Sequence, residues 1–285
     1  MDESLKKANI ETSVINQAEA ASVTGEALAD MLKAMGYRPV IGMHTIYELC
    51  RAFLTHPHDE KTRRRFCILR DLEPAFVPPI PDLLHQEILK LRKGSAVLPF
   101  LNHLDQISTR FEINQMANGT FNPQGERFVR NRERAMQRDL PVQSQAYLRH
   151  VREVMTRNPP AQKLRTFGDV LAHFTEGIPK IIRRIYRNAI TVEEANELAN
   201  RLDSFPTLRA AVRANIYYCF VHIVHRRSPA KDKISDPRHA IDASYSDALV
   251  TNDRQLAKLA PQLNPDLTVL PWKNLVTTKA GSVPS

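Results

Sequence analysis

The sequence is poor in glycine, cysteine and tryptophan, which number 9, 3 and 1 among its 285 residues. So little glycine excludes a collagen-like or glycine-rich low-complexity chain. The three cysteines are too few and too far apart for a disulfide framework or a zinc signature, so we expect reduced thiols and a cytoplasmic protein. No apolar run approaches the roughly 18 residues of a membrane span, and the N-terminus has no apolar signal core.

The composition is otherwise that of a globular protein with a basic surplus. Hydrophobic residues make up 42% and charged residues 25% of the chain, which is enough apolar material for one large domain or two ordinary ones. Lys and Arg outnumber Asp and Glu by 40 to 31, for a net charge of +9. Such a balance attracts polyanions, of which nucleic acid is the commonest.

Two segments that alternate strands with helices flank a helical middle. The pattern predicts an α/β fold on a central parallel sheet, interrupted by a mostly helical insertion. The expected strands are 9–15, 39–43, 75–77, 248–251 and 267–270. The expected parts are an α/β domain of 8–81 and 219–276, an insertion of 82–218 that forms a lobe beside the sheet, and a disordered tail of 277–285.

Four acidic residues lie where the expected strands end or the helices begin: Glu11, Glu48, Asp236 and Asp253. In a parallel sheet, ligands bind outside the carboxyl ends of the strands. Carboxylates gathered there form an oxygen-rich pocket that suits Mg²⁺ or Mn²⁺, and such an ion activates a water for attack on phosphorus. Together the four acids predict metal-dependent chemistry on phosphate esters.

Each acid also has a structural interpretation. Thr45 and Glu48 have the spacing of a capping box, and Asp236, which a proline follows, fits an N-cap. Asp253 could cap the next helix, and Glu11 could be a surface charge on an edge strand. Capping and metal binding are compatible, because helix starts face the same sheet edge, so both interpretations stay open.

Around these acids the sequence resembles the PIN-domain nucleases, many of which are toxins of bacterial toxin–antitoxin pairs. The segment 10–16, with Glu11, is similar to the family's opening strand and first acid, and Glu48-Leu49 is similar to its second acid. The stretch 236–256, with Val250-Thr251-Asn252-Asp253, resembles the family's third acid, apolar helix, strand and Thr-x-Asp end. The resemblance covers about residues 8–55 and 234–272.

The resemblance implies a three-layer α/β/α sandwich and a metal-dependent endoribonuclease, in which the four acids are catalytic and hold one or two Mg²⁺ or Mn²⁺ ions. Ser13 and Thr251 lie beside these acids and could support them through hydrogen bonds. Asp247 could support the site from its rim, with a turn or cap as the alternative. His44 and His239 are expected to be structural, with a general-acid role for His239 as the alternative.

RNA is the expected partner, and the sequence does not exclude DNA. Four basic residues just before Asp236 are expected to contact the nucleic-acid backbone: Arg226, Arg227, Lys231 and Lys233. A run of charge is also the usual composition of a solvated helix face. An antitoxin-like protein and a second copy of the chain are open as further partners, and no membrane is expected.

Two departures from the family pattern keep other functions open. The first acid is Glu11, where Asp is usual, and the added methylene moves the carboxylate oxygens. The insertion at 82–218 has no counterpart in the family pattern. The alternative is therefore a non-catalytic nucleic-acid-binding or interaction protein on a degenerate PIN-like fold. A metal-dependent phosphatase or DNA nuclease that uses the same acids is a third interpretation.

Overall fold

The structure of the chain is a computed structural model. It describes residues 4–56, 59–127, 129–131, 134, 149, 151, 153, 155–157, 159–160, 163–225 and 236–280. The basic cluster predicted at 226–233 and the residues 281–285 of the predicted tail lie outside this description.

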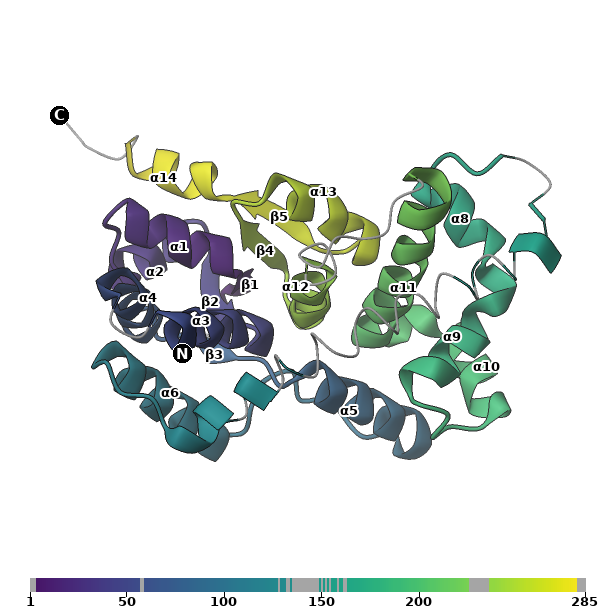
Figure 1. Ribbon diagram of the computed structural model, residues 1–285, viewed down its shortest axis with the longest axis horizontal. Coiled ribbons are helices and arrows are strands. Elements are labelled where there is room, and N and C mark those ends of the chain that lie inside the picture. The colour runs from purple at the N-terminus through teal and green to yellow at the C-terminus, as the bar shows by residue number, and fades with distance from the viewer. Residues whose placement is uncertain are drawn as a thin grey trace.

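Five parallel strands form one sheet in the order β3-β2-β1-β4-β5 (Figure 1). The strands are β1 (Lys6–Ile10), β2 (Tyr37–Ile41), β3 (Ala75–Phe76), β4 (Ala248–Thr251) and β5 (Thr268–Pro271). β1 and β4 are neighbours, with Ala8 opposite Ala248 and Ile10 opposite Val250. This confirms the predicted α/β fold on a central parallel sheet, built from residues on both sides of the helical middle.

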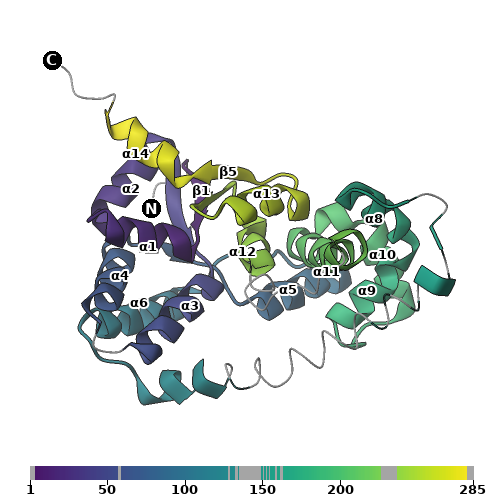
Figure 2. The same cartoon turned by 45° about the horizontal axis from the view of Figure 1, so that its top comes forward.

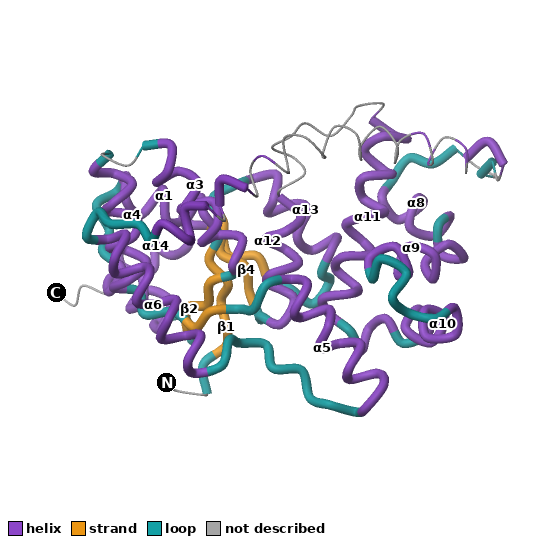
Figure 3. The backbone as a smooth tube through the Cα atoms, turned by 60° about the horizontal axis from the view of Figure 1, so that its bottom comes forward, coloured by secondary structure: helices purple, strands orange, loops and turns teal. Residues whose placement is uncertain are grey.

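Helices cover both faces of the sheet and complete three layers, as Figure 3 shows with the strands between the two groups of helices. Strand side chains alternate between the faces, so Ile10 and Val250 belong to one apolar core and Leu249 to another. On the first face lie α1 (Thr12–Ala20), α2 (Gly25–Ala34), α3 (Met43–Thr55), α4 (Glu60–Asp71), α6 (His103–Ala117) and α14 (Trp272–Ala280). On the second lie α11 (Pro206–His225), α12 (Asp236–Asp242) and α13 (Arg254–Leu263).

A second body of helices extends beyond the sheet, at the right of Figure 1. Its apolar core, separate from those against the sheet, is formed by α5, α8, α9, α10 and one part of α11. The bounds of the four helices not yet given are α5 (Ile80–Lys93), α8 (Phe167–His173), α9 (Ile178–Ile185) and α10 (Val192–Asn200). Within the described residues, no helix has the length and apolar character needed to cross a bilayer.

The described residues of 82–218 contain helices and no strand, but they do not form one lobe. α6 packs in the sheet-side core, because Ile113, Met116 and Ala117 on one of its faces are buried with α3 and α4. α11 belongs to both bodies, since Ala210, Ala211 and Ala214 pack against α12 and α13. The expected boundary at 218 falls inside this continuous helix, so it is not a domain boundary.

Two of the expected element ends also need correction. β1 ends at Ile10 and α1 begins at Thr12, so residues 12–15 are helical rather than extended. At the other end of the chain, α14 continues to Ala280, past the expected start of the tail at 277. Burial of Trp272 and Leu275 in the sheet-side core anchors this last helix.

Candidate metal centre

The carboxyl ends of β1, β2 and β4 meet at one edge of the sheet. The strand order reverses between β1 and β4, and ligands of parallel α/β sheets bind at such a switch point. Glu11 follows β1, Gly42 follows β2 and Asn252 follows β4, so each of these strands delivers polar groups to the same edge.

The helix that follows β2 is fixed by a carboxylate from α12. α3 has Gly42 as its N-cap, and Oδ2 of buried Asp242 accepts a hydrogen bond from the backbone N of His44 at 2.9 Å. A Cβ atom on Gly42 would clash with this carboxylate, so glycine permits the close approach. Asp242 thus replaces the capping box expected from Thr45 and Glu48, and it docks α12 against α3.

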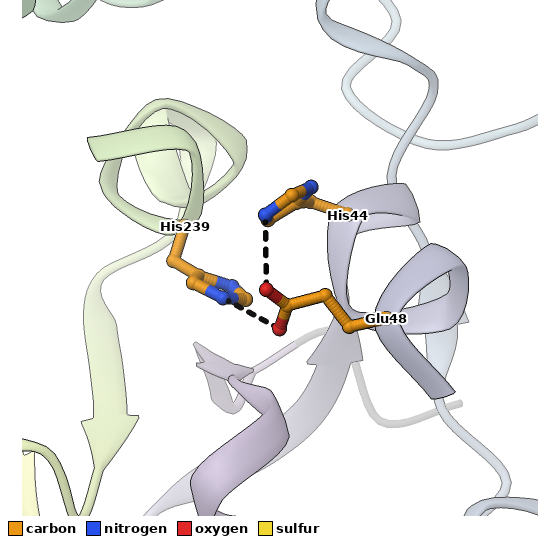
Figure 4. Close-up of side chains that lie close together, drawn as sticks. All are labelled: His44, Glu48 and His239. Atoms are coloured by element: carbon orange, nitrogen blue, oxygen red, sulfur yellow. Dashed lines mark hydrogen bonds and ion pairs between the residues drawn. The ribbon is translucent and has the colours of Figure 1, made fainter. Parts of the chain in front are cut away.

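This docking brings His44 and Glu48 of α3 together with His239 of α12 (Figure 4). Nε2 of His239 lies 3.1 Å from Oε2 of Glu48, and Nε2 of His44 lies 3.3 Å from Oε1. In the described part of the chain this is the only set of three or more His, Cys, Asp or Glu residues whose ligand atoms all lie within 4.8 Å of one another. We call it the His–Glu–His cluster.

The charges of the cluster are coupled. Burial opposes the ionisation of Glu48, but its contacts with His239 and His44 outweigh this and hold its pKa below the ordinary value. Burial likewise opposes protonation of His239, but the contact with Glu48 raises its pKa above the ordinary value. Burial lowers the pKa of His44 to about 4, assisted by the neighbouring charge of His239. Without an ion, these shifts favour a carboxylate at Glu48, a proton on His239 and a neutral ring at His44.

The hydroxyl of Thr45 determines which nitrogen of His239 faces Glu48. It donates to the backbone oxygen of Ile10 at 3.3 Å, and its oxygen lies 3.5 Å from Nδ1 of His239. Because the hydroxyl hydrogen is committed to Ile10, Nδ1 is the donor to Thr45 and Nε2 is directed at the carboxylate. A second partner of this kind is typical of histidines that bind metals.

The residues present fit a divalent cation. His44 is 5% exposed and its Nε2 faces Glu48, but its Nδ1 has no hydrogen-bond partner, which is costly for a buried polar group. Ligands about 2.1 Å from a tetrahedral ion lie roughly 3.4 Å apart, close to the observed separations from Glu48. Two imidazoles and one carboxylate suit Mn²⁺, Zn²⁺ or Fe²⁺ better than Mg²⁺, which prefers oxygen ligands.

Glu11 lies at the same edge, where it joins β1 to β4. Its Oε1 accepts from the hydroxyls of Thr251, at 2.8 Å, and Ser13, and from the backbone N of Asn252 at 3.3 Å. Its Oε2 accepts from the backbone N of Ser13 at 2.7 Å. A carboxylate has about four acceptor sites, so these bonds occupy most of its capacity. Ser13 and Thr251 thus support Glu11, as expected, and Glu11 caps α1.

The other predicted acids lie outside the His–Glu–His cluster. Asp253 follows β4 and caps α13, and its Oδ1 accepts from the backbone N of Gln255 at 2.6 Å and of Leu256 at 3.1 Å. Asp236 is the first residue of α12, one turn before His239. Asp247 lies at the opposite edge, because it precedes β4 and its Oδ2 accepts from the backbone N of Lys7 at 2.7 Å. A rim position is therefore wrong for Asp247.

Of the four predicted acids, Glu48 alone belongs to the cluster, and both of its histidines were expected to be structural. One signal for them was present in the sequence: His44 and Glu48 are four residues apart, which places them on one helix face. Nothing in the sequence joined this pair to His239, because their contact depends on how α12 docks against α3.

Comparisons with protein-family models, with curated proteins and with solved structures find no match to this chain.

Proposed function

We propose that the chain is a metal-dependent nuclease that cleaves RNA, with the His–Glu–His cluster as its metal centre. The observation that carries the proposal is the convergence of one carboxylate and two buried imidazoles at the carboxyl edge of a parallel sheet. The net charge of +9 favours a polyanionic substrate. The resemblance to the PIN-domain nucleases adds RNA as that polyanion.

The roles of the side chains follow from their positions. A divalent cation held by His44, Glu48 and His239 supplies a more acidic water and offsets the negative charge of the phosphate. The hydroxyl of Thr12 donates to Oε2 of Glu48 and orients the carboxylate. Glu11 acts as a positioning residue, because it caps the helix that begins at Thr12.

One observation favours a second candidate, a non-catalytic nucleic-acid-binding protein on the same fold. Glu48 and His239 already form a buried, charge-assisted pair that joins α3 to α12 without an ion. Such a pair can be retained for the specificity of packing alone. The two candidates differ in what removal of the pair does to cleavage when binding is preserved.

The test is cleavage of an end-labelled single-stranded RNA with Mn²⁺, Zn²⁺ or Mg²⁺, and in excess EDTA. We expect cleavage with Mn²⁺ or Zn²⁺, none in EDTA, and a loss of at least 100-fold in Glu48→Gln, since a misplaced ligand is costly to the rate. Glu60→Gln is the matched control, because Glu60 is an exposed residue that pairs with Arg64 on α4. Cleavage by Glu48→Gln at the rate of this control would reject the proposal, and a DNA substrate cut in preference would correct its substrate.

A further inference from the structure

A cleft of about 940 Å³ lies next to the His–Glu–His cluster. Its walls come from α3, α6, the start of α5, residues 121–125 and Val129, and Figure 2 shows α3 and α6 on the same side of the molecule. His44 belongs to both sites, since it lines the cleft and lies 3.3 Å from Glu48. A molecule in the cleft would therefore reach the cluster.

Apolar side chains of α3 and α6 line one part of the cleft, and the charged side chains that line it are of both signs, with Glu112 and Asp242 as the acids. Ile46 and Met116 line the cleft from the two helices. The partly buried ring of Phe121 lines it from the segment after α6. Arg187, just after α9, and Arg238, next to His239 in α12, also line it. The positive charge of Arg238 acts on His44, which places this arginine close to the cluster.

One polar pair lies in the cleft. Nδ2 of Asn122 donates to Oε1 of Glu112 at 3.0 Å, and both residues are lining residues. A carboxylate and an amide beside an aromatic ring suit a flat ligand that has an apolar face and a hydrogen-bonding edge. Nucleobases have this combination, and stacking on an aromatic ring with hydrogen bonds to the edge is the usual way in which proteins bind unpaired bases.

We propose that this cleft is a subsite for one unpaired nucleotide, with the base between α3 and α6 and the phosphate at Arg187, Arg238 and His44. The proposal rests on the proposed function and specifies its substrate, because the base edges of a duplex are paired and stacked and cannot enter. The volume lies within the usual range of small-molecule sites, about 300–1,000 Å³. Through α6, residues 121–125 and Val129, the inserted part of the chain would thus have a role in selecting the substrate.

The test measures binding without cleavage. A fluorescent eight-nucleotide single-stranded RNA is titrated with the full chain in excess EDTA, beside the same RNA in a blunt duplex. We expect the single strand to bind at least tenfold more tightly. Ser108→Trp, at an exposed position of α6 that lines the cleft, should fill it and weaken single-strand binding at least tenfold. Asn114→Trp is the matched control, because Asn114 is exposed on the same helix but does not line the cleft.

Two further variants separate the base from the phosphate. Phe121→Leu keeps an apolar side chain but removes the stacking face, so we expect a loss of roughly fivefold or more. Arg187→Gln should lower affinity and reduce the salt dependence of binding by about one counterion, whereas Arg201→Gln, at an exposed pair with Glu197, should not. Thermal melting confirms that each variant is folded.

The outcomes distinguish this proposal from the proposed function. Affinities of Ser108→Trp and Phe121→Leu within twofold of the unchanged chain would overturn the subsite, even if the protein cleaves RNA. Equal binding of duplex and single strand would also overturn it. Loss of binding in both variants would support the subsite, even if no metal produced cleavage and the nuclease proposal failed.

Discussion

The rings of His44 and His239 lie 4.7 Å apart between centroids, tilted by 59°. Both residues are buried, and each has a ring nitrogen close to the carboxylate of Glu48. Two imidazolium ions at this distance would repel each other, so the pair accommodates one protonated ring. A divalent cation would displace that proton and use both rings as neutral ligands.

Metal binding should stabilise the protein through the cluster. We expect saturating Mn²⁺ or Zn²⁺ to raise the melting temperature by roughly 5 °C, because an ion at about 100 times its Kd adds about 2.7 kcal/mol to the free energy of unfolding. The shift should disappear in Glu48→Gln, which keeps the shape of the side chain and loses its charge. Scanning calorimetry with and without EDTA measures it.

Asp253→Asn is the matched control for that experiment. Asn caps helices about as well as Asp, so α13 should remain intact, and the metal-induced shift should persist because Asp253 lies outside the cluster. A shift that vanishes in Asp253→Asn and survives in Glu48→Gln would mean that the ion binds elsewhere along the sheet edge.

The sheet was predictable because its signals are local. A strand buried on both faces reads as a short apolar run, and 248–251 was predicted to the residue. Glu11 was harder to place, because Ile10 to Ile15 contains three β-branched apolar residues and has the composition of a strand. The structure ends β1 at Ile10 because Glu11 caps α1 through the backbone N of Ser13. A cap contact of this kind outweighs a weak preference for the extended conformation.

The candidate site was predictable only in part, because its partners are distant in the sequence. The sequence located Glu48 and the sheet edge. It could not show that Asp242 would cap α3 or that His239 would reach Glu48, since both contacts join α12 to α3. The same acid can cap a helix or bind an ion, and the difference lies in its neighbours: Asp253 accepts from two backbone N–H groups, whereas Glu48 faces two imidazoles.

The effects of substitutions at Gly42 and Asp242 on the free energy of unfolding should be coupled. Gly42→Ala places a Cβ against the carboxylate of Asp242, so we expect a loss of about 2 kcal/mol in the free energy of unfolding and weaker metal binding, as α3 and α12 separate. In an Asp242→Ser background the same substitution should cost at least 1 kcal/mol less. Urea unfolding of the four proteins measures the coupling. Additive losses would show that Gly42 is needed for its backbone conformation and not for the contact.

His44 should make the metal-free protein sensitive to mild acid. Its pKa is lowered by burial from 6.5 to about 4, so between these values the unfolded chain binds more protons than the folded one. Stability is therefore lost as the pH falls, by about 2 kcal/mol between pH 7 and pH 5. His239 has a raised pKa and acts in the opposite sense, with stability lost as the pH rises above 6.5.

Urea unfolding in EDTA at pH 7 and pH 5 isolates this effect by comparison with His44→Gln. The variant removes the titrating ring, so its loss of stability between the two pH values should be smaller than that of the unchanged chain by about 2 kcal/mol. Bound Mn²⁺ or Zn²⁺ should also reduce the acid sensitivity near pH 6. The same pH dependence in both proteins would show that His44 is protonated in the folded state.

Substitutions of Glu11 test whether this acid stabilises the fold or binds the metal ion. Glu11→Gln removes one acceptor oxygen from a carboxylate that accepts bonds from Ser13, Thr251 and Asn252. The new amide group would face donors, so we expect a loss of about 1–3 kcal/mol in the free energy of unfolding. Glu11→Asp should also destabilise the protein, because the shorter side chain cannot both cap α1 and reach Thr251.

Metal-induced stabilisation should remain in both variants, since Glu11 lies outside the His–Glu–His cluster. Calorimetry with and without Mn²⁺ reports both quantities at once. If Glu11→Gln instead keeps its stability and loses the response to Mn²⁺, Glu11 is a ligand of the ion, and the centre is the four-acid site that the sequence predicted.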